Sequence, residues 1–287
     1  MAAFLGIVFD GIAYGSLLFL ISLGLSVTMG LMNFVNLAHG TFAMLGGFVC
    51  IELTRRLRVP FLLTLPIVFV VVGVVGAGLE LTLYRRLYRR GHLDQVLFTI
   101  GVAFMAGAAA TWAWGASQQP VEVPAFLRGQ IRVAGIDLGA YRLFLVALVA
   151  AVASALGLLL TRTRFGAQLR AAVDNPQAAA GAGINVGLLF SVTFALGSGL
   201  AGLGGALAIE VLGLDPTFAF KYLVSFLVVV VVGGTGSLKG SLVAALLLGV
   251  VDVTGKYYVP QIGSFVIYAA MVALLIAFPA GLYGRRV

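Results

Sequence analysis

Charged residues are scarce in this chain. Asp, Glu, Lys and Arg make up 10% of its 287 residues, whereas soluble domains carry about 25%. Hydrophobic residues account for 61%. This composition excludes an ordinary soluble domain and indicates a protein that lies within a lipid bilayer.

Cysteine and histidine are nearly absent. The lone Cys50 excludes an intrachain disulfide and a cysteine-based metal site. The two histidines, His39 and His92, have no cluster of carboxylates near them in the sequence that a catalytic or metal centre would need. The sequence therefore predicts no enzyme activity, no metal site and no cofactor bound by this chain itself.

The net charge of +8 does not indicate a protein that binds nucleic acid. The basic residues lie at the ends of apolar blocks, as in 55–58 and 85–90, where lysine and arginine contact lipid headgroups. The partner that these charges indicate is the lipid bilayer, and we expect no nucleic acid partner.

Long apolar blocks recur along the whole chain. A helix needs about 20 apolar residues to cross a hydrocarbon core of roughly 30 Å, and several blocks approach or exceed that length without a charged residue. We predict an all-α fold, a polytopic helical membrane protein with about 8–9 membrane segments in a single transmembrane domain over 1–287. The expected segments lie near 5–29, 34–54, 61–83, 93–115, 141–160, 187–211, 218–234, 240–256 and 261–281.

The distribution of basic residues predicts an orientation. If 84–92, 161–186, the turn at 235–239 and the C-terminus lie in the cytoplasm, that side holds ten of the 18 basic residues. Nine crossings then place the N-terminus outside and the C-terminus inside. If 34–54 is re-entrant, the N-terminus lies inside and the rest is unchanged. The sequence leaves both arrangements open.

A polar, alanine-rich stretch between two charge-free blocks is the most informative part of the chain. Arg170 and Asp174 are four residues apart, so they share one helical face. Pro176 favours the start of a second turn, with Asp174 or Asn175 as its cap. We predict a short cytoplasmic helix over 167–181 that receives a push from a soluble partner.

A second polar stretch lies in the first half of the chain, where Asn36, His39 and Thr41 interrupt apolar sequence. Polar groups inside a bilayer are costly unless they line a cavity or bond across helices. With Ser198, from the glycine-rich run at 197–205, they form the candidate translocation pathway. The alternative is that Asn36 and His39 tie helices together, and the sequence leaves this choice open.

Two further patterns concern the architecture. The run at 233–240 lacks the Gly-Lys-Ser/Thr ending of a phosphate-binding loop, and we interpret it as a tight turn between two membrane helices. The chain therefore has no nucleotide site of its own. The segments 61–92 and 141–166 are both apolar helices with a basic end, which suggests an internal repeat.

Four motifs together resemble one known family. Residues 36–40, Asn-Leu-Ala-His-Gly, resemble an Asn-Phe-Ala-His-Gly signature, and 164–185 resembles a cytoplasmic coupling loop. The turn at 233–237 and the run at 278–285 complete the pattern. Over nearly its whole length the chain resembles the permease subunits of branched-chain amino acid ABC importers. It is more similar to the shorter, high-affinity leucine-type permease than to its longer sister subunit.

The resemblance implies a multi-pass protein of the bacterial plasma (inner) membrane and a set of partners. These are a homologous second permease, two cytoplasmic ATPase subunits that hold ATP and Mg²⁺, and an external solute-binding protein. The coupling loop near 161–186 would contact the ATPase through Arg170, Ala171, Asp174, Asn175, Gln177, Ala178, Ala179 and Gly181. The loop departs from the family pattern at Gly181 and Ala182, where larger apolar residues are common.

The resemblance implies uptake of branched-chain or other small amino acids, with urea or short amides as alternative substrates in the same family. A passive channel or an ion-driven carrier is the alternative from a different class. A carrier needs intramembrane carboxylates along an ion route. The acidic residues of this chain are expected at the span ends, with no Asp or Lys at mid-depth, which favours the importer subunit.

Overall fold

The structure is a computed structural model that describes residues 2–32, 34–88, 90–120, 123–133 and 136–283. This part of the chain is helical apart from one two-stranded sheet and the connecting loops. Six helices are long and apolar enough to cross a bilayer. They are α1 (Ala2–Met32), α3 (Phe61–Thr82), α4 (His92–Trp114), α5 (Ala140–Arg162), α8 (Val186–Leu212) and α11 (Leu238–Tyr258). The predicted all-α membrane fold is confirmed.

The other three expected membrane segments are shorter helices. They are α2 (His39–Arg55), the pair α9 (Phe218–Lys221) and α10 (Leu223–Gly233), and α12 (Gly263–Ala277). Helix α2 starts later than the expected boundary at 34, because Asn36 turns the chain: its Oδ1 accepts a hydrogen bond from the Ala38 amide at 3.0 Å. A side-chain bond of this kind offers the backbone an alternative to the helix.

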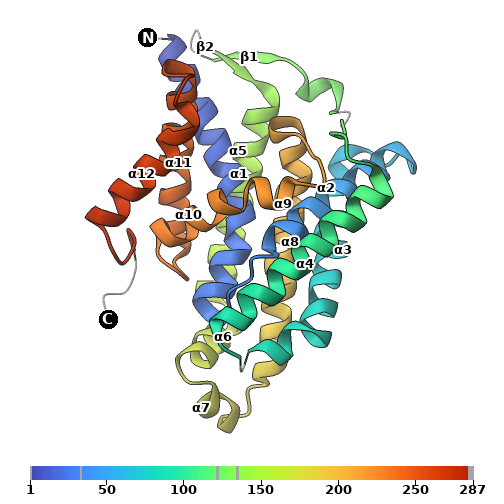
Figure 1. Ribbon diagram of the computed structural model, residues 1–287, viewed down its shortest axis with the longest axis vertical. Helices are drawn as coiled ribbons and strands as arrows, with labels where there is room; N and C mark the ends of the chain where they lie inside the picture. Colours follow the sequence, from blue (N-terminus) through green and yellow to red (C-terminus); the bar gives the residue numbers. More distant parts are fainter. Residues whose placement is uncertain (1, 33, 89, 121–122, 134–135, 284–287) are drawn as a thin grey trace.

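Contacts at the ends of α1 and α2 show that the segment 34–55 crosses the molecule. Asp10, near the start of α1, forms an ion pair with Arg142 at the start of α5. Arg55, at the end of α2, donates a hydrogen bond at 3.2 Å to Gln119 in the loop that leads to α5. Helix α1 therefore starts and α2 ends at the same side of the molecule (Figure 1). The broken segment is a crossing and not a re-entrant hairpin.

The two long loops lie at opposite ends of the molecule. The loop between α4 and α5 contains the 3-10 helix η2 (Ala125–Leu127) and the antiparallel strands β1 (Gln130–Val133) and β2 (Ile136–Gly139), with Gln130 opposite Gly139. The opposite end carries the 3-10 helix η1 (Tyr84–Leu87) and the helices α6 (Arg164–Asp174) and α7 (Pro176–Gly181) (Figure 1). This separation agrees with the predicted arrangement of the loops on two sides of a membrane.

The packing of the helices reveals an inverted repeat. Helix α1 packs along α11 and α10, and α8 packs along α3 and α2. Helices α1 and α8 run in opposite directions, and each is followed by a break, a shorter helical segment and a long helix (Figure 1). Inverted repeats of this kind are common in transporters. The repeat suggested by 61–92 and 141–166 is not the one found, because α3 corresponds to α11.

Glycine allows the two halves to approach closely at the centre of the molecule. A Cβ atom at Gly24 of α1 would collide with the backbone of Gly197 in α8, and one at Gly205 would collide with the Ala43 carbonyl in α2. Small residues at helix crossings let backbones come together without side chains between them. The glycine-rich run at 197–205 therefore serves packing within the chain.

Candidate functional site

The single coupling helix expected over 167–181 is two helices in the structure. Helix α6 ends at Asp174, and α7 begins at Pro176. The side chain of Asn175 lies between them and accepts a hydrogen bond from the Ala178 amide at 2.9 Å. Proline fits the first position of a helix and asparagine caps it. The predicted start of a second helical turn at Pro176 is therefore confirmed, and the prediction of one continuous helix over 167–181 is wrong.

A small apolar cluster fixes both helices to the membrane domain. Leu169 and Ala172 of α6, Ala179 of α7 and Leu189 of α8 are buried together. In addition, Arg170 donates a hydrogen bond to a backbone carbonyl at the end of α5, where cationic side chains satisfy unpaired helix carbonyls. The coupling segment is therefore tied to the two long helices on either side of it.

The structure sorts the candidate coupling residues by exposure. Seven of the eight are exposed, namely Arg170, Ala171, Asp174, Asn175, Gln177, Ala178 and Gly181. Ala179 is only 5% exposed and belongs to the apolar cluster. The exposed residues are available to a soluble partner, whereas Ala179 holds α7 in place.

The candidate pathway residues lie around the first break, which is the non-helical segment between α1 and α2, and all of them are buried. Asn36 and His39 are fully or almost fully buried, and Nε2 of His39 lies 2.9 Å from the carbonyl oxygen of Ile21 in α1. Thr41 and Ser198 donate their hydroxyl groups to backbone carbonyls one turn before them. Among these four side chains, the bond of His39 joins two helices, whereas the bonds of Asn36, Thr41 and Ser198 are local. The interpretation as a tie between helices therefore fits His39.

The backbone of the first break is bonded by α4. The Val35 amide donates to Oε1 of Gln95 at 3.1 Å, and the Leu37 amide donates to Oγ1 of Thr99 at 3.1 Å. Unsatisfied amides are costly at membrane depth, so non-helical backbone there needs such partners. Sequence reasoning missed this role. The sequence feature that could have indicated it is the pair Gln95 and Thr99, which are four residues apart in a largely apolar segment.

A second break lies between α8 and α9 and repeats the hydrogen bonding of the first. Oδ1 of Asp215 accepts the Thr217 amide at 2.8 Å, in the same type of turn that Asn36 makes. The helices that follow the two breaks, α2 and α9, are in contact. If Gly40 of α2 carried a Cβ atom, that atom would lie 2.8 Å from the carbonyl oxygen of Ala219 in α9. The two breaks are thus equivalent parts of the inverted repeat, and their helices meet inside the membrane domain.

The second break holds a pair of charged residues beside α4. The ring centres of Phe220 and Phe104 are 4.6 Å apart, and Phe104 lies at the middle of α4. Lys221 follows Phe220 directly, and its Nζ atom lies 4.0 Å from the Asp215 carboxylate. The carbonyl of Leu214, one residue before Asp215, accepts a hydrogen bond from the Gln119 amide in the loop between α4 and α5 at 2.8 Å. The carboxylate therefore lies toward that end of the molecule, and the expectation that no Asp or Lys lies at mid-depth stays a prediction.

A buried carboxylate links three elements near the coupling segment. Glu80, in the last turn of α3, has no exposed surface and accepts hydrogen bonds from Ser191 of α8 at 2.5 Å and from Tyr88 at 3.0 Å. Arg85 lies 3.4 Å from the same carboxylate and donates to Ser191 at 2.8 Å. Burial, and then the Glu80 charge, raise the pKa of Tyr88, so its hydroxyl stays protonated. Sequence reasoning missed this cluster, because its members lie far apart in the chain.

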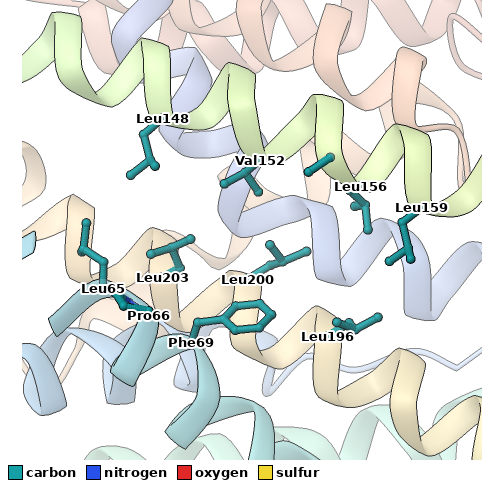
Figure 2. A pocket seen from close by; sticks show the side chains of 11 residues that line it. Leu65, Pro66, Phe69, Leu148, Val152, Leu156, Leu159, Leu196, Leu200 and Leu203 are labelled. Carbon is teal, nitrogen blue, oxygen red and sulfur yellow. The ribbon is translucent and has the colours of Figure 1, made fainter. Parts of the chain in front are cut away.

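A groove between α3, α5 and α8 has a volume of about 560 Å³ (Figure 2). Its lining is apolar, with Leu65 and Phe69 from α3, Val152 and Leu156 from α5, and Leu200 from α8. A zwitterionic solute needs hydrogen-bond partners, which these side chains do not supply. The groove is therefore suited to hydrocarbon and not to a free amino acid.

The pattern of helices, breaks and coupling segment agrees with a comparison with known proteins. Residues 7–275 match the family described as branched-chain amino acid transport system / permease component. The chain belongs to this family. It is a multi-pass membrane protein and a transport component, which is not itself an enzyme.

The permease is similar to relatives over most of its length. It is 25% identical to the high-affinity branched-chain amino acid transport system permease protein LivH of Escherichia coli K12, over 98% of this chain and 96% of the relative. The corresponding protein BraD of Pseudomonas aeruginosa is 24% identical, over 96% and 94%. A probable branched-chain amino acid transport permease protein LivH of Methanocaldococcus jannaschii is 26% identical, over 92% and 86%. No solved structure matches the chain. The resemblance drawn from the motifs is confirmed.

Proposed function

We propose that this permease is the membrane subunit of an ATP-driven importer for branched-chain or other small amino acids. The observation that carries the proposal is the family match over 7–275, together with relatives named as branched-chain amino acid permeases over nearly their full length. The two-helix coupling segment supports it, because its exposed residues offer a docking surface at one end of the bundle.

The proposal includes a defined set of partners. A homologous second permease completes the membrane domain, two cytoplasmic ATPase subunits bind ATP and Mg²⁺, and an external solute-binding protein delivers the substrate. The exposed residues of α6 and α7 contact an ATPase subunit, and the apolar cluster with Leu189 passes the movement to α8. The bacterial plasma (inner) membrane is the location, with α6 and α7 in the cytoplasm and the N-terminus outside.

We further propose that the translocation route passes the two helix breaks. Asn36, His39, Thr41 and Ser198 contribute by fixing the position of the first break, since each of them is buried and bonded to backbone. Neutral polar groups and non-helical backbone supply hydrogen bonds to a zwitterion without holding it permanently.

Purification and reconstitution test the proposed function. The tagged permease is isolated in mild detergent, its partners are identified, and the complex is placed in proteoliposomes with ATP and the co-encoded binding protein. We expect ATP-dependent uptake of radiolabelled leucine that unlabelled valine and isoleucine inhibit. Uptake of urea or acetamide in preference to leucine would contradict the substrate assignment, and uptake that does not depend on ATP would contradict the importer.

A further inference from the structure

The apolar groove between α3, α5 and α8 follows the direction of α5. On this helix the lining residues recur every three or four positions, at Leu148, Val152, Ala155 and Leu159, so they share one helical face. Figure 2 shows Leu148, Val152 and Leu159 pointing from α5 toward α3 and α8. The helical rise from Leu148 to Leu159 is about 16 Å, close to half of a hydrocarbon core of about 30 Å. The groove is therefore about as long as one leaflet is deep.

A second, smaller apolar groove joins the first. It has a volume of about 240 Å³ and lies between α3 and α8. Both grooves include Phe69 and Leu196 in their lining, and the second continues to Ala77 of α3 and Val192 of α8. The surface therefore offers two connected apolar grooves, one beside α5 and one between α3 and α8.

An arginine lies near the end of each groove, at the end of the molecule that carries η1 and α6. Arg162 is the last residue of α5, three positions after Leu159 on the same helical face, and it is exposed. Arg85 donates a hydrogen bond to Ser191, the residue before Val192, and its side chain is 44% exposed. Both apolar grooves therefore lead toward a cationic group.

The larger groove is built differently from the surfaces at which helices of this chain pack. Helix contacts inside membranes use small residues, as Gly24 does against Gly197 and Gly205 against Ala43. Among the residues that the structure describes, the lining has leucine at seven of eleven positions, one alanine and no glycine. A helix about 10 Å across and about 16 Å long also fills roughly 1,300 Å³, more than twice the 560 Å³ of the groove. The groove therefore fits a chain thinner than a helix.

We propose that the two grooves bind the acyl chains of an anionic phospholipid, and that Arg162 and Arg85 contact its headgroup. A diacyl phospholipid has two hydrocarbon chains joined to one phosphate, and the surface has two joined grooves with an arginine near the end of each. Basic residues beside grooves between membrane helices suit anionic headgroups, and long side chains near helix ends extend to the interface. The leaflet is the cytoplasmic one in the proposed orientation, and the lipid does not depend on the transported substrate.

Photo-crosslinking of the purified permease, with the subunits that co-purify, tests the site. The protein is placed in phosphatidylcholine vesicles that contain phosphatidylglycerol with a diazirine in one acyl chain, and the labelled peptides are identified by mass spectrometry. We expect the label on the lining residues of α5 and α8 and not on the opposite face of α5. Phosphatidylcholine with the same diazirine should label these residues at least fivefold less, because it has no net charge to interact with the arginines.

Ala155→Phe fills the larger groove from an exposed lining position and should remove most of the label. Ala150→Phe is the matched control, because Ala150 is exposed on the opposite face of the same helix, and it should leave the label unchanged. Arg162→Gln should lower labelling by phosphatidylglycerol about fivefold, since one cation near an anionic lipid is lost, whereas Arg162→Lys should retain it.

Three results would overturn the proposal. Equal labelling of Ala155→Phe and Ala150→Phe would overturn the acyl-chain site, and equal labelling by the two lipids would overturn the anionic headgroup. A photoreactive amino acid in place of Val152 that cross-links to a second permease and not to lipid would assign the groove to a protein partner. None of these experiments measures uptake, so the proposed function can fail while the lipid site stands, and the reverse.

Discussion

At the scale of single residues, the carboxylate of Glu80 connects the end of α3 to the start of α8. Ser191 and Tyr88 donate hydrogen bonds to it, and Arg85 bonds both the carboxylate and Ser191. Helix α8 follows α7 after a short connection. The cluster therefore joins the end of α3 to the start of the helix that follows the proposed coupling helices, and we expect it to hold that junction in one geometry.

Glu80→Ala should destabilise the permease by about 3 kcal/mol, because removing one partner of a buried ionic cluster leaves the others without their bonds. Thermal inactivation of the detergent-purified complex measures the effect. Glu210→Ala is the control, since Glu210 is exposed on α8, and it should leave the midpoint nearly unchanged. Equal midpoints for the two variants would contradict a structural role for Glu80.

His39→Ala and Asn36→Ala should each lower the amount of assembled complex, because the two side chains are buried and bonded within the chain. The loss of a buried hydrogen bond corresponds to about 1–3 kcal/mol. The measurements are the yield of purified complex and the uptake rate per complex. Normal yield with slower uptake would instead assign these residues to direct contact with the substrate.

At the scale of elements, the coupling segment divides into an outer and an inner face. The inner face is the cluster of Leu169, Ala172 and Ala179 with Leu189, and the outer face carries the exposed candidate residues. The Asn175 cap bends the segment between α6 and α7, so the exposed residues come from two short helices. A groove on the ATPase would therefore receive a bent surface and not one straight helix.

Ala171→Arg and Ala178→Arg should uncouple ATP hydrolysis from uptake while the permease stays in the membrane. Both alanines are exposed on the proposed docking surface, where a long charged side chain would block close approach. ATPase activity and leucine uptake are measured on the same proteoliposomes. Thr82→Arg adds the same charge at an exposed position at the end of α3 and should keep coupling. Normal uptake in both alanine variants would refute docking at this surface.

At the scale of the whole molecule, the inverted repeat explains why two helices start inside the membrane domain. Each half contains a long helix, a break held by an Asn or Asp turn, and a short helix, and the two short helices meet at Gly40 and Ala219. The two halves run in opposite directions (Figure 1). The first break is bonded to the first turns of α4, and the second lies next to Gln119 beyond the other end of α4. The two breaks therefore lie toward opposite ends of the membrane domain, and the helices that follow them meet in between.

The orientation of the molecule is tested with single cysteines in a Cys50→Ala background. Arg86→Cys and Gln168→Cys should react with an impermeant thiol reagent only after cell lysis, and Ser117→Cys should react on intact cells. All three positions are exposed. The helices η1 and α6, which carry Arg86 and Gln168, lie at the end of the molecule opposite the loop between α4 and α5, which carries Ser117 (Figure 1). Labelling of Gln168→Cys before lysis would reverse the orientation, and with it the side on which the ATPase binds.

The sequence by itself determined the environment, the helical class and the family. Long charge-free runs determine the first two, because burial in a bilayer depends on composition and length and not on the details of packing. The helix start at Pro176 was also predictable, with Asp174 or Asn175 as its cap, since capping is a local interaction between neighbours in the chain. The structure selects Asn175.

Only the tertiary structure decided the partners of each buried polar group. Lys221 precedes the charge-free block at 222–238, and its ion pair with Asp215 forms only because the break between α8 and α9 folds back on itself. Glu80 and Ser191 are 111 positions apart, yet they share a hydrogen bond. Sequence patterns report on local spacing, whereas solvation inside a membrane domain is set by contacts between distant segments, and those contacts decide which polar residues are buried and bonded.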